Sequence, residues 1–211
     1  MFVVTADQDA SSRSGEQVEA VLAHLAGAAW APAAAEQMLL PFQRTVGDEI
    51  QGVFAGAGAC LDAVLELQRQ QQWAVGVGIG TATLADEARA SGGPAFVRAR
   101  TAVERARSKA VTVPLAVCAD GADDGEQHRA EEAEALLQLI AAVVRRRSKA
   151  GWEVVDRLRA GATTHRQVAR DLGVSAQAVG QRLRVALWAE ERAVHPLAIR
   201  LLTDLDAGAG P

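Results

Sequence analysis

The sequence predicts an α+β protein in which a domain of strands and helices precedes an all-α domain. Strand-like and helix-like segments alternate through the first half of its 211 residues. The charge is also divided, because residues 1–144 carry a net charge of −9 and residues 145–211 carry +5. Near Gly173, two helix-capping patterns flank a glycine, which is typical of two short helices joined by a tight turn. These observations indicate two parts with different partners.

Short apolar runs rich in β-branched residues indicate the buried strands of the first domain. The segments between them are rich in alanine and have apolar residues at helical spacing. Gly47-Asp48-Glu49 predicts a hairpin turn between the second and third strands. We expect strands at 2–6, 38–46, 50–55, 73–81 and 111–118, and helices at 14–30, around 60–67 and at 94–109.

The order of these elements, βαββαβ and then αβ, is that of a ferredoxin-like sheet with one appended unit. We place this sheet domain in residues 1–122 and a connecting segment in residues 123–150. An amphipathic helix over 126–147 fills most of that segment, and residues 151–211 form the all-α domain. This connecting helix has an apolar stripe that can pack on the sheet or against a second copy of the chain. The stripe is formed by Leu136, Leu139, Ile140, Val143 and Val144.

The all-α domain carries the sharper motif. Thr164 followed by Gln167 is a capping box that starts one helix, and Ser175 caps the next helix. Gly173 permits the tight turn between the two helices. The residues that we expect these helices to bury are Val168, Ala169 and Leu172 in the first, and Val179, Leu183, Ala186 and Leu187 in the second.

This pattern resembles the helix-turn-helix of sigma-factor region 4 and of LuxR-type regulators, in which the second helix enters the major groove of DNA. Phosphate contacts give such a protein affinity, and base contacts give it specificity. The expected base-facing or closely approaching residues are Ala176, Gln177, Gly180, Gln181 and Arg184. The expected phosphate-facing residues are Thr164, His165, Arg166, Arg170 and Arg182, with the cap residue Ser175 beside them. A helical hairpin that binds protein is the alternative.

The first domain resembles the nucleotide-cyclase superfamily, which includes class III adenylyl cyclases and GGDEF domains. Its first strand ends at Asp7, its hairpin carries Gly47-Asp48-Glu49, and a glycine-rich strand follows at 75–80. Over nearly its whole length the chain also resembles the SatD family of small bacterial proteins. The shared pieces are Asp7 with Ser12 and Arg13, Gly-Asp-Glu-x-Gln-Gly at 47–52, the Gly-Ile-Gly strand, Gly-Pro-Ala-Phe at 93–96 and the C-terminal helix-turn-helix.

The resemblance implies a nucleotide-cyclase-like site in which Asp7, Asp48 and Glu49 hold Mg²⁺ and a nucleotide. The alternative is a plain turn, because Gly-Asp needs no ligand to form one. Class III cyclases use an Asn and an Arg on a late helix to stabilise the transition state. The chain contains no Asn, although Arg98 and Arg100 lie on the corresponding helix. We therefore expect no catalytic residues and a degenerate domain that senses a ligand or assembles the protein.

Composition excludes several classes of protein. Apolar residues make up 49% of the chain, which excludes wholesale disorder. No apolar run is long enough to span a membrane, and the N-terminus lacks the regions of a signal peptide. Cys60 and Cys118 are the two cysteines, too few for a disulfide scaffold or a four-cysteine zinc site. We expect a cytoplasmic protein.

Together these features predict a cytoplasmic transcriptional regulator that binds double-stranded DNA. We expect a homodimer, because dimers gain affinity by reading two half-sites. Two other classes stay open. One is a nucleotide-binding or nucleotide-processing enzyme of the cyclase superfamily, and the other is a protein-binding adaptor.

Overall fold

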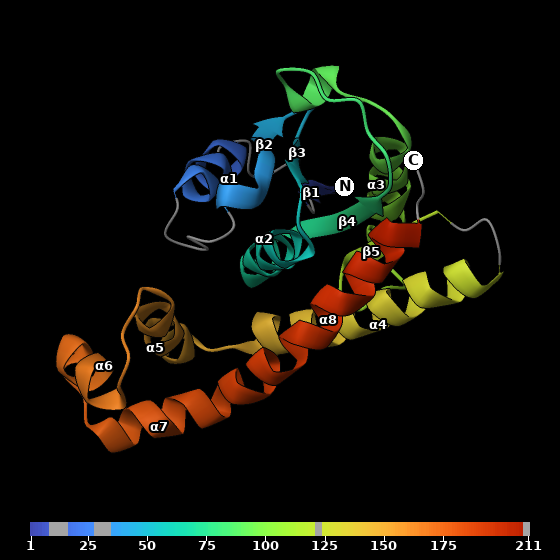
Figure 1. The fold of residues 1–211 in the computed structure, drawn as a ribbon. Helices are drawn as coiled ribbons and strands as arrows, with labels where there is room; N and C mark the ends of the chain where they lie inside the picture. Colours follow the sequence, from blue (N-terminus) through green and yellow to red (C-terminus); the bar gives the residue numbers. More distant parts are fainter. Residues whose placement is uncertain (9–16, 28–34, 121–123, 209–211) are drawn as a thin grey trace.

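The computed structural model describes residues 1–8, 17–27, 35–120 and 124–208. It confirms a mixed α+β chain with a five-stranded sheet in the N-terminal part and helices after it (Figure 1). The strands are β1 (Phe2–Gln8), β2 (Met38–Arg44), β3 (Glu49–Phe54), β4 (Trp73–Ile79) and β5 (Leu115–Cys118). The α-helices are α1 (Gln17–Ala26), α2 (Ala57–Arg69), α3 (Pro94–Ala106), α4 (Asp124–Arg146), α5 (Lys149–Arg159), α6 (His165–Leu172), α7 (Ala176–Val185) and α8 (Trp188–Gly208). Short 3₁₀ helices are η2 (Ala35–Gln37) and η3 (Ala88–Ala90).

The strands of the sheet follow the order β2-β3-β1-β4-β5. The neighbouring pairs β2–β3, β3–β1 and β1–β4 are antiparallel, and β5 lies parallel to β4. The predicted hairpin turn connects β2 to β3, with Gly47 at a φ of +63° that favours glycine. In the register of β1 and β3, Asp7 lies opposite Glu49. The sheet therefore brings two of the three predicted acidic side chains, Asp7 and Glu49, to adjacent strands.

One face of the sheet is covered by α1, α2, α4 and α8 (Figure 1). Apolar residues from β1, β3 and β4 share one buried cluster with the inner sides of these helices. Cys60 of α2 is fully buried in this cluster, and burial raises the pKa of its thiol. Cys60 is therefore a core residue and not a reactive thiol. Cys118, the other cysteine, is only half-buried and accepts a hydrogen bond from Arg105.

The opposite face of β4 is covered by α3, which lies unusually close to the strand. A Cβ atom at Gly76 would lie 2.2 Å from the backbone nitrogen of Val103, and one at Gly78 would lie 2.1 Å from the carbonyl oxygen of Ala95. Such distances are far shorter than real contacts, so only glycine fits at these positions. The glycine-rich strand therefore serves close helix–strand packing.

The last four helices leave the sheet and return to it. In Figure 1, α5, α6 and α7 lie together at one end of the molecule, and α8 runs back alongside α4. Only residues 147–148 connect α4 to α5, and only residues 186–187 connect α7 to α8. Ala198, Leu202 and Leu205 of α8 join the same buried cluster as the sheet residues. The helix-turn-helix is therefore held to the sheet part from both of its ends.

The apolar stripe of α4 is divided between two surroundings. Ile140 and Val144 are buried against the sheet part, whereas Leu139 is largely exposed. The inner side of α4 thus packs on the sheet part. Its outer side stays exposed, and a second copy of the chain is the other partner that the sequence allows for it. Within the described residues, no helix combines the length and the apolar character needed to cross a membrane.

Candidate functional site

The helix-turn-helix consists of α6, a tight turn and α7, with the caps that the sequence predicts. The hydroxyl oxygen of Thr164 accepts a hydrogen bond from the backbone N–H of Gln167 at 3.2 Å. The hydroxyl oxygen of Ser175 accepts one from Ala178 at 3.1 Å. Gly173 ends α6 in the left-handed conformation, at a φ of +64°. Local side-chain and backbone chemistry therefore sets both the start of each helix and the turn between them.

A small apolar core holds the two helices against α5. Val154 of α5, Val168 and Ala169 of α6 and Val179 of α7 are buried together. Leu172 and Leu183, also expected inside, pack against this cluster while partly exposed. The expectation that Leu187 is buried is wrong. Its side chain is 43% exposed, because α7 ends at Val185 and the helical spacing does not continue to residue 187.

The outward side of α7 carries the predicted base-facing residues. Ala176, Gln177, Gln181 and Arg184 are exposed, and Gly180 is half-buried. The guanidinium of Arg184 donates to the side-chain oxygen of Gln181 at 2.7 Å. Gly180 leaves a gap beside His165, whose ring nitrogen would lie 4.0 Å from an added Cβ. The structure therefore brings polar side chains and small residues together on one exposed helix face.

The predicted phosphate-facing residues fall into two groups. His165, Arg166 and Arg170 of α6 are exposed, and His165 lies close to Gly180 of this face. Within the part of the chain that the structure describes, the side chains of Arg166 and Arg170 make no hydrogen bond or ion pair. Arg182 differs, because it is half-buried and its guanidinium lies 3.2 Å from a carboxylate oxygen of Glu153 on α5. Arg182 thus links α7 to α5, whereas the two α6 arginines are available to a ligand.

The predicted metal or nucleotide residues lie at one end of the sheet. Asp7 and Glu49 are buried side by side, and each faces an arginine of the α3 region. Arg107 donates to Asp7 at 2.8 Å, and Arg100 donates to Glu49 at 2.5 Å. Thr45 donates its hydroxyl to the other Glu49 oxygen at 2.6 Å. Burial raises the pKa of Asp7, although the positive charge of Arg107 acts to lower it. The negative charge of Asp48 raises the pKa further.

The surroundings of these carboxylates give no support to a metal site, and the binding of Mg²⁺ and a nucleotide there stays a prediction. Asp48 is half-buried in the hairpin turn, and arginines already compensate the charges of Asp7 and Glu49. Among the described residues, no three His, Cys, Asp or Glu side chains gather in a way that could hold a metal ion. Ser12 and Arg13, part of the resemblance to the SatD family, lie outside the described residues. Arg98 is also engaged, through Asp120 at 2.6 Å.

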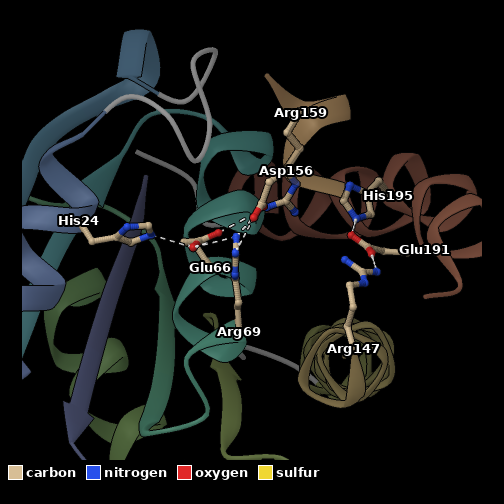
Figure 2. Close-up of polar contacts among 8 residues, drawn as sticks. All are labelled: His24, Glu66, Arg69, Arg147, Asp156, Arg159, Glu191 and His195. Carbon is tan, nitrogen blue, oxygen red and sulfur yellow. Dashed lines mark hydrogen bonds and ion pairs between the residues drawn. The ribbon is translucent and has the colours of Figure 1, made fainter. Parts of the chain in front are cut away.

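Ion pairs that the sequence analysis did not find connect the sheet part to α5. Figure 2 shows His24 of α1 and Glu66 of α2 in contact, with their side-chain atoms 2.8 Å apart. Arg159 of α5 lies 3.3 Å from the other Glu66 oxygen. Arg69 of α2 donates two hydrogen bonds to Asp156 of α5, at 2.8 Å and 2.7 Å. Bidentate pairs of this kind fix orientation as well as distance, so α5 is held firmly on α2.

The Glu66 cluster is electrostatically coupled. Burial alone would raise the pKa of Glu66, but the hydrogen bond from His24 and the charges of Arg69 and Arg159 hold it below its ordinary value. The hydrogen bond to Glu66 raises the pKa of His24 by more than burial lowers it. A cavity of about 350 Å³ opens beside these groups. It is lined by Gln17, Ala20, Val21, His24, Glu66, Arg69, Gln70 and Gln72.

A second buried cluster joins the two short connections on either side of the helix-turn-helix. Arg147 donates to the carbonyl oxygen of Ala186 at 3.0 Å and to the carboxylate of Glu191 (Figure 2). His195 lies 3.3 Å from the other oxygen of Glu191. The Arg147 guanidinium also stacks over the Trp152 ring, 4.4 Å from its centroid. No periodicity in the sequence predicts this cluster, because its members come from three separate segments.

Comparisons with known proteins add no assignment, because no family model matches the chain and the searches of curated proteins and of solved structures find no match.

Proposed function

We propose that the chain is a cytoplasmic, DNA-binding transcriptional regulator that acts as a homodimer. The observation that carries the proposal is the exposed face of α7, where Gln177, Gln181 and Arg184 lie opposite the buried Val179. Glutamine can bond the edge of adenine in two places, and arginine can do the same with guanine. Arg166 and Arg170 are exposed on α6, the helix that precedes α7, where they are available to DNA phosphates.

The charge of the chain supports the same function. Residues 145–211 carry a net charge of +5, whereas the preceding residues are strongly acidic. The phosphates of a nucleic acid are attracted to the basic segment 145–211 and repelled by the acidic segment before it. This division favours DNA over a protein partner of no particular charge, and it directs the DNA to the end of the molecule that carries α6 and α7.

We further propose that the sheet part is a nucleotide-cyclase-like, ferredoxin-like domain of the SatD type that senses a ligand or assembles the protein. The strand order β2-β3-β1-β4 with antiparallel neighbours supports this, since it is the order of a βαββαβ unit. The cavity beside His24 and Glu66 supports a sensing role, because its walls include the residues that hold α5. The arginine partners of Asp7 and Glu49 give no support to catalysis.

The test is fluorescence anisotropy with the purified full-length protein and a pool of random duplexes, from which preferred sequences are then selected. We expect binding that weakens steeply with salt and a selected sequence that binds at least about 10³-fold more tightly than random DNA. Arg166→Ala/Arg170→Ala weakens binding to both kinds of duplex. The control Arg89→Ala removes an arginine that is exposed on the sheet part and leaves binding unchanged. Absence of binding at about 50 mM salt would contradict the proposal and favour the adaptor.

A further inference from the structure

An apolar patch lies on the outer side of α4, next to the connection between α7 and α8. Leu139 of α4 is 65% exposed, Val185 of α7 is 68% exposed and Leu187 of the connection is 43% exposed. These three residues line a hollow of about 160 Å³, whose other walls are Ala142, Val143, Ala186 and the two arginines Arg146 and Arg147. Single exposed apolar side chains are common on proteins, but several large ones around one hollow are typical of an interaction surface.

The backbone of Leu187, one of the three residues of this patch, has a strained conformation. Leu187 has a φ of +51°, a left-handed conformation that leucine rarely adopts. The neighbouring carbonyl of Ala186 accepts the Arg147 hydrogen bonds, and the carbonyl of Leu187 accepts one from the backbone N–H of Glu191 at 2.9 Å. Buried polar contacts thus fix an exposed leucine in a strained conformation at the edge of the hollow.

Charge is distributed unevenly along α4. All five of its acidic residues lie within 124–134, whereas its last twelve residues contain no acid and end in Arg145 and Arg146. Glu132 and Arg146 are both exposed. Glu132 lies seven residues before Leu139 and Arg146 lies seven after it, so all three share one face of the helix. The exposed leucine is therefore centred between a negative and a positive side chain.

We propose that this patch binds a second copy of the same chain, with the two α4 helices antiparallel and Leu139 at the two-fold axis. In that arrangement each Leu139 contacts its equivalent, as a self-complementary interface requires. Glu132 then faces Arg146 of the second copy, and Ala135 faces Val143. A parallel arrangement would instead oppose Glu132 to Glu132 and Arg146 to Arg146, which is repulsive. Both the apolar centre and the charges at its two ends therefore favour the antiparallel pair.

This inference deepens the homodimer part of the proposed function by naming the surface, and it does not depend on DNA binding. We test it by light scattering without DNA, at tens of micromolar protein. The wild-type mass is expected to be about 44 kDa, twice the 22.1 kDa of one chain. Leu139→Arg places two positive charges at the axis and lowers the mass to that of one chain. The control Val97→Arg, at a position on α3 that is 67% exposed, leaves the mass of the dimer unchanged.

Charge reversal tests the direction of the two helices and involves only exposed residues, so that folding is retained. Glu132→Arg and Arg146→Glu each oppose like charges and weaken self-association at least about tenfold. The double variant Glu132→Arg/Arg146→Glu restores opposite charges across the axis and recovers the dimer. Circular dichroism checks that each variant is folded. A wild-type mass of one chain, or a dimer that Leu139→Arg and both single reversals leave intact, overturns the proposal whether or not the protein binds DNA.

Discussion

Arg147 and Glu191 form an ion pair in which both side chains are fully buried. Arg147 lies in the connection between α4 and α5, and Glu191 lies in the first turn of α8. Burial alone would raise the pKa of Glu191, but the neighbouring His195 and the hydrogen bond from Arg147 hold it below its ordinary value. The pair therefore fastens together the two places where the chain enters and leaves the helix-turn-helix.

Removing one partner of this pair is expected to destabilise the protein strongly. Glu191→Ala leaves the Arg147 guanidinium buried without its counter-charge, which typically costs about 3–5 kcal/mol of the free energy of unfolding. Urea denaturation followed by circular dichroism measures the change. The double variant Arg147→Met/Glu191→Leu removes both charges and recovers most of the loss. As a control, Arg182→Ala breaks a half-exposed pair and costs about 1 kcal/mol or less. An equally small loss for Glu191→Ala would show that the pair is not truly buried.

The contact between His24 and Glu66 is expected to make stability depend on pH. The pKa of His24 is raised in the folded protein, so its protonated form stabilises the fold. That contribution is complete below the unfolded histidine pKa of about 6.5 and is lost as the pH rises through the raised folded value. His24 is 46% exposed, so solvent limits the effect to less than about 1 kcal/mol.

The measurement is the urea midpoint of the wild type and of His24→Gln between about pH 5.5 and 9. The two midpoints should differ most at the acidic end and converge at the alkaline end. A difference between wild type and His24→Gln that grows with pH has the wrong sign and would refute the assignment.

The close approach of α3 to β4 predicts a large difference between two glycine-to-alanine changes. A Cβ atom at position 76 meets backbone atoms of Val103 and Ala99 at 2.2 Å and 2.6 Å, and a backbone cannot move aside as a flexible side chain can. We expect Gly76→Ala to cost at least about 2 kcal/mol of the free energy of unfolding. Gly92→Ala is the matched control, because nothing lies within 4 Å of its Cβ position. Similar thermal midpoints for the two variants would contradict the packing.

The proposed DNA interface predicts that two kinds of contact respond differently to mutation. Gln181→Ala removes a base contact and should cost about 1–3 kcal/mol at a matched site and little on random DNA. Arg170→Ala removes a phosphate contact, so it should weaken binding to both and lower the salt slope by about 1. Anisotropy on matched and scrambled duplexes across a salt series separates the two. Identical behaviour of the two variants would mean that α7 does not lie in the groove.

Much of the fold follows from local patterns in the sequence. The β-branched runs, the Gly47 turn and the caps at Thr164 and Ser175 involve residues close together in the chain, so the pattern and its cause are visible in one segment. The return of α8 to the sheet was not predicted. Its buried residues are Ala198, Leu202 and Leu205, whose spacing identifies a helix face but does not identify the surface that the face covers.

The candidate site was predictable to the same extent. Gln181 and Arg170 were assigned to exposed faces because helical periodicity alone decides which side is buried. The partners of charged residues were not predictable. Arg159 pairs with Glu66 from 93 residues away, and Arg107 pairs with Asp7 from 100 residues away. Composition and spacing cannot predict contacts between residues so far apart in the sequence. For this reason the resemblance to cyclases implied a metal at Asp7 but did not reveal that Arg107 lies beside it.

The two short connections at residues 147–148 and 186–187 have a consequence for how DNA sites can be arranged. A recognition unit on one long linker can pivot and tolerate variable spacing between half-sites, at an entropic cost when the linker becomes ordered. Here the unit is an insertion between α4 and α8, with a polypeptide connection on each side and the Arg147 contacts between them. One extra base pair turns the next half-site by about 34° around the DNA axis, at 10–10.5 base pairs per turn. If the chain binds DNA as proposed, a unit mounted in this way cannot follow such a rotation, so the binding sites of the dimer should have one fixed spacing.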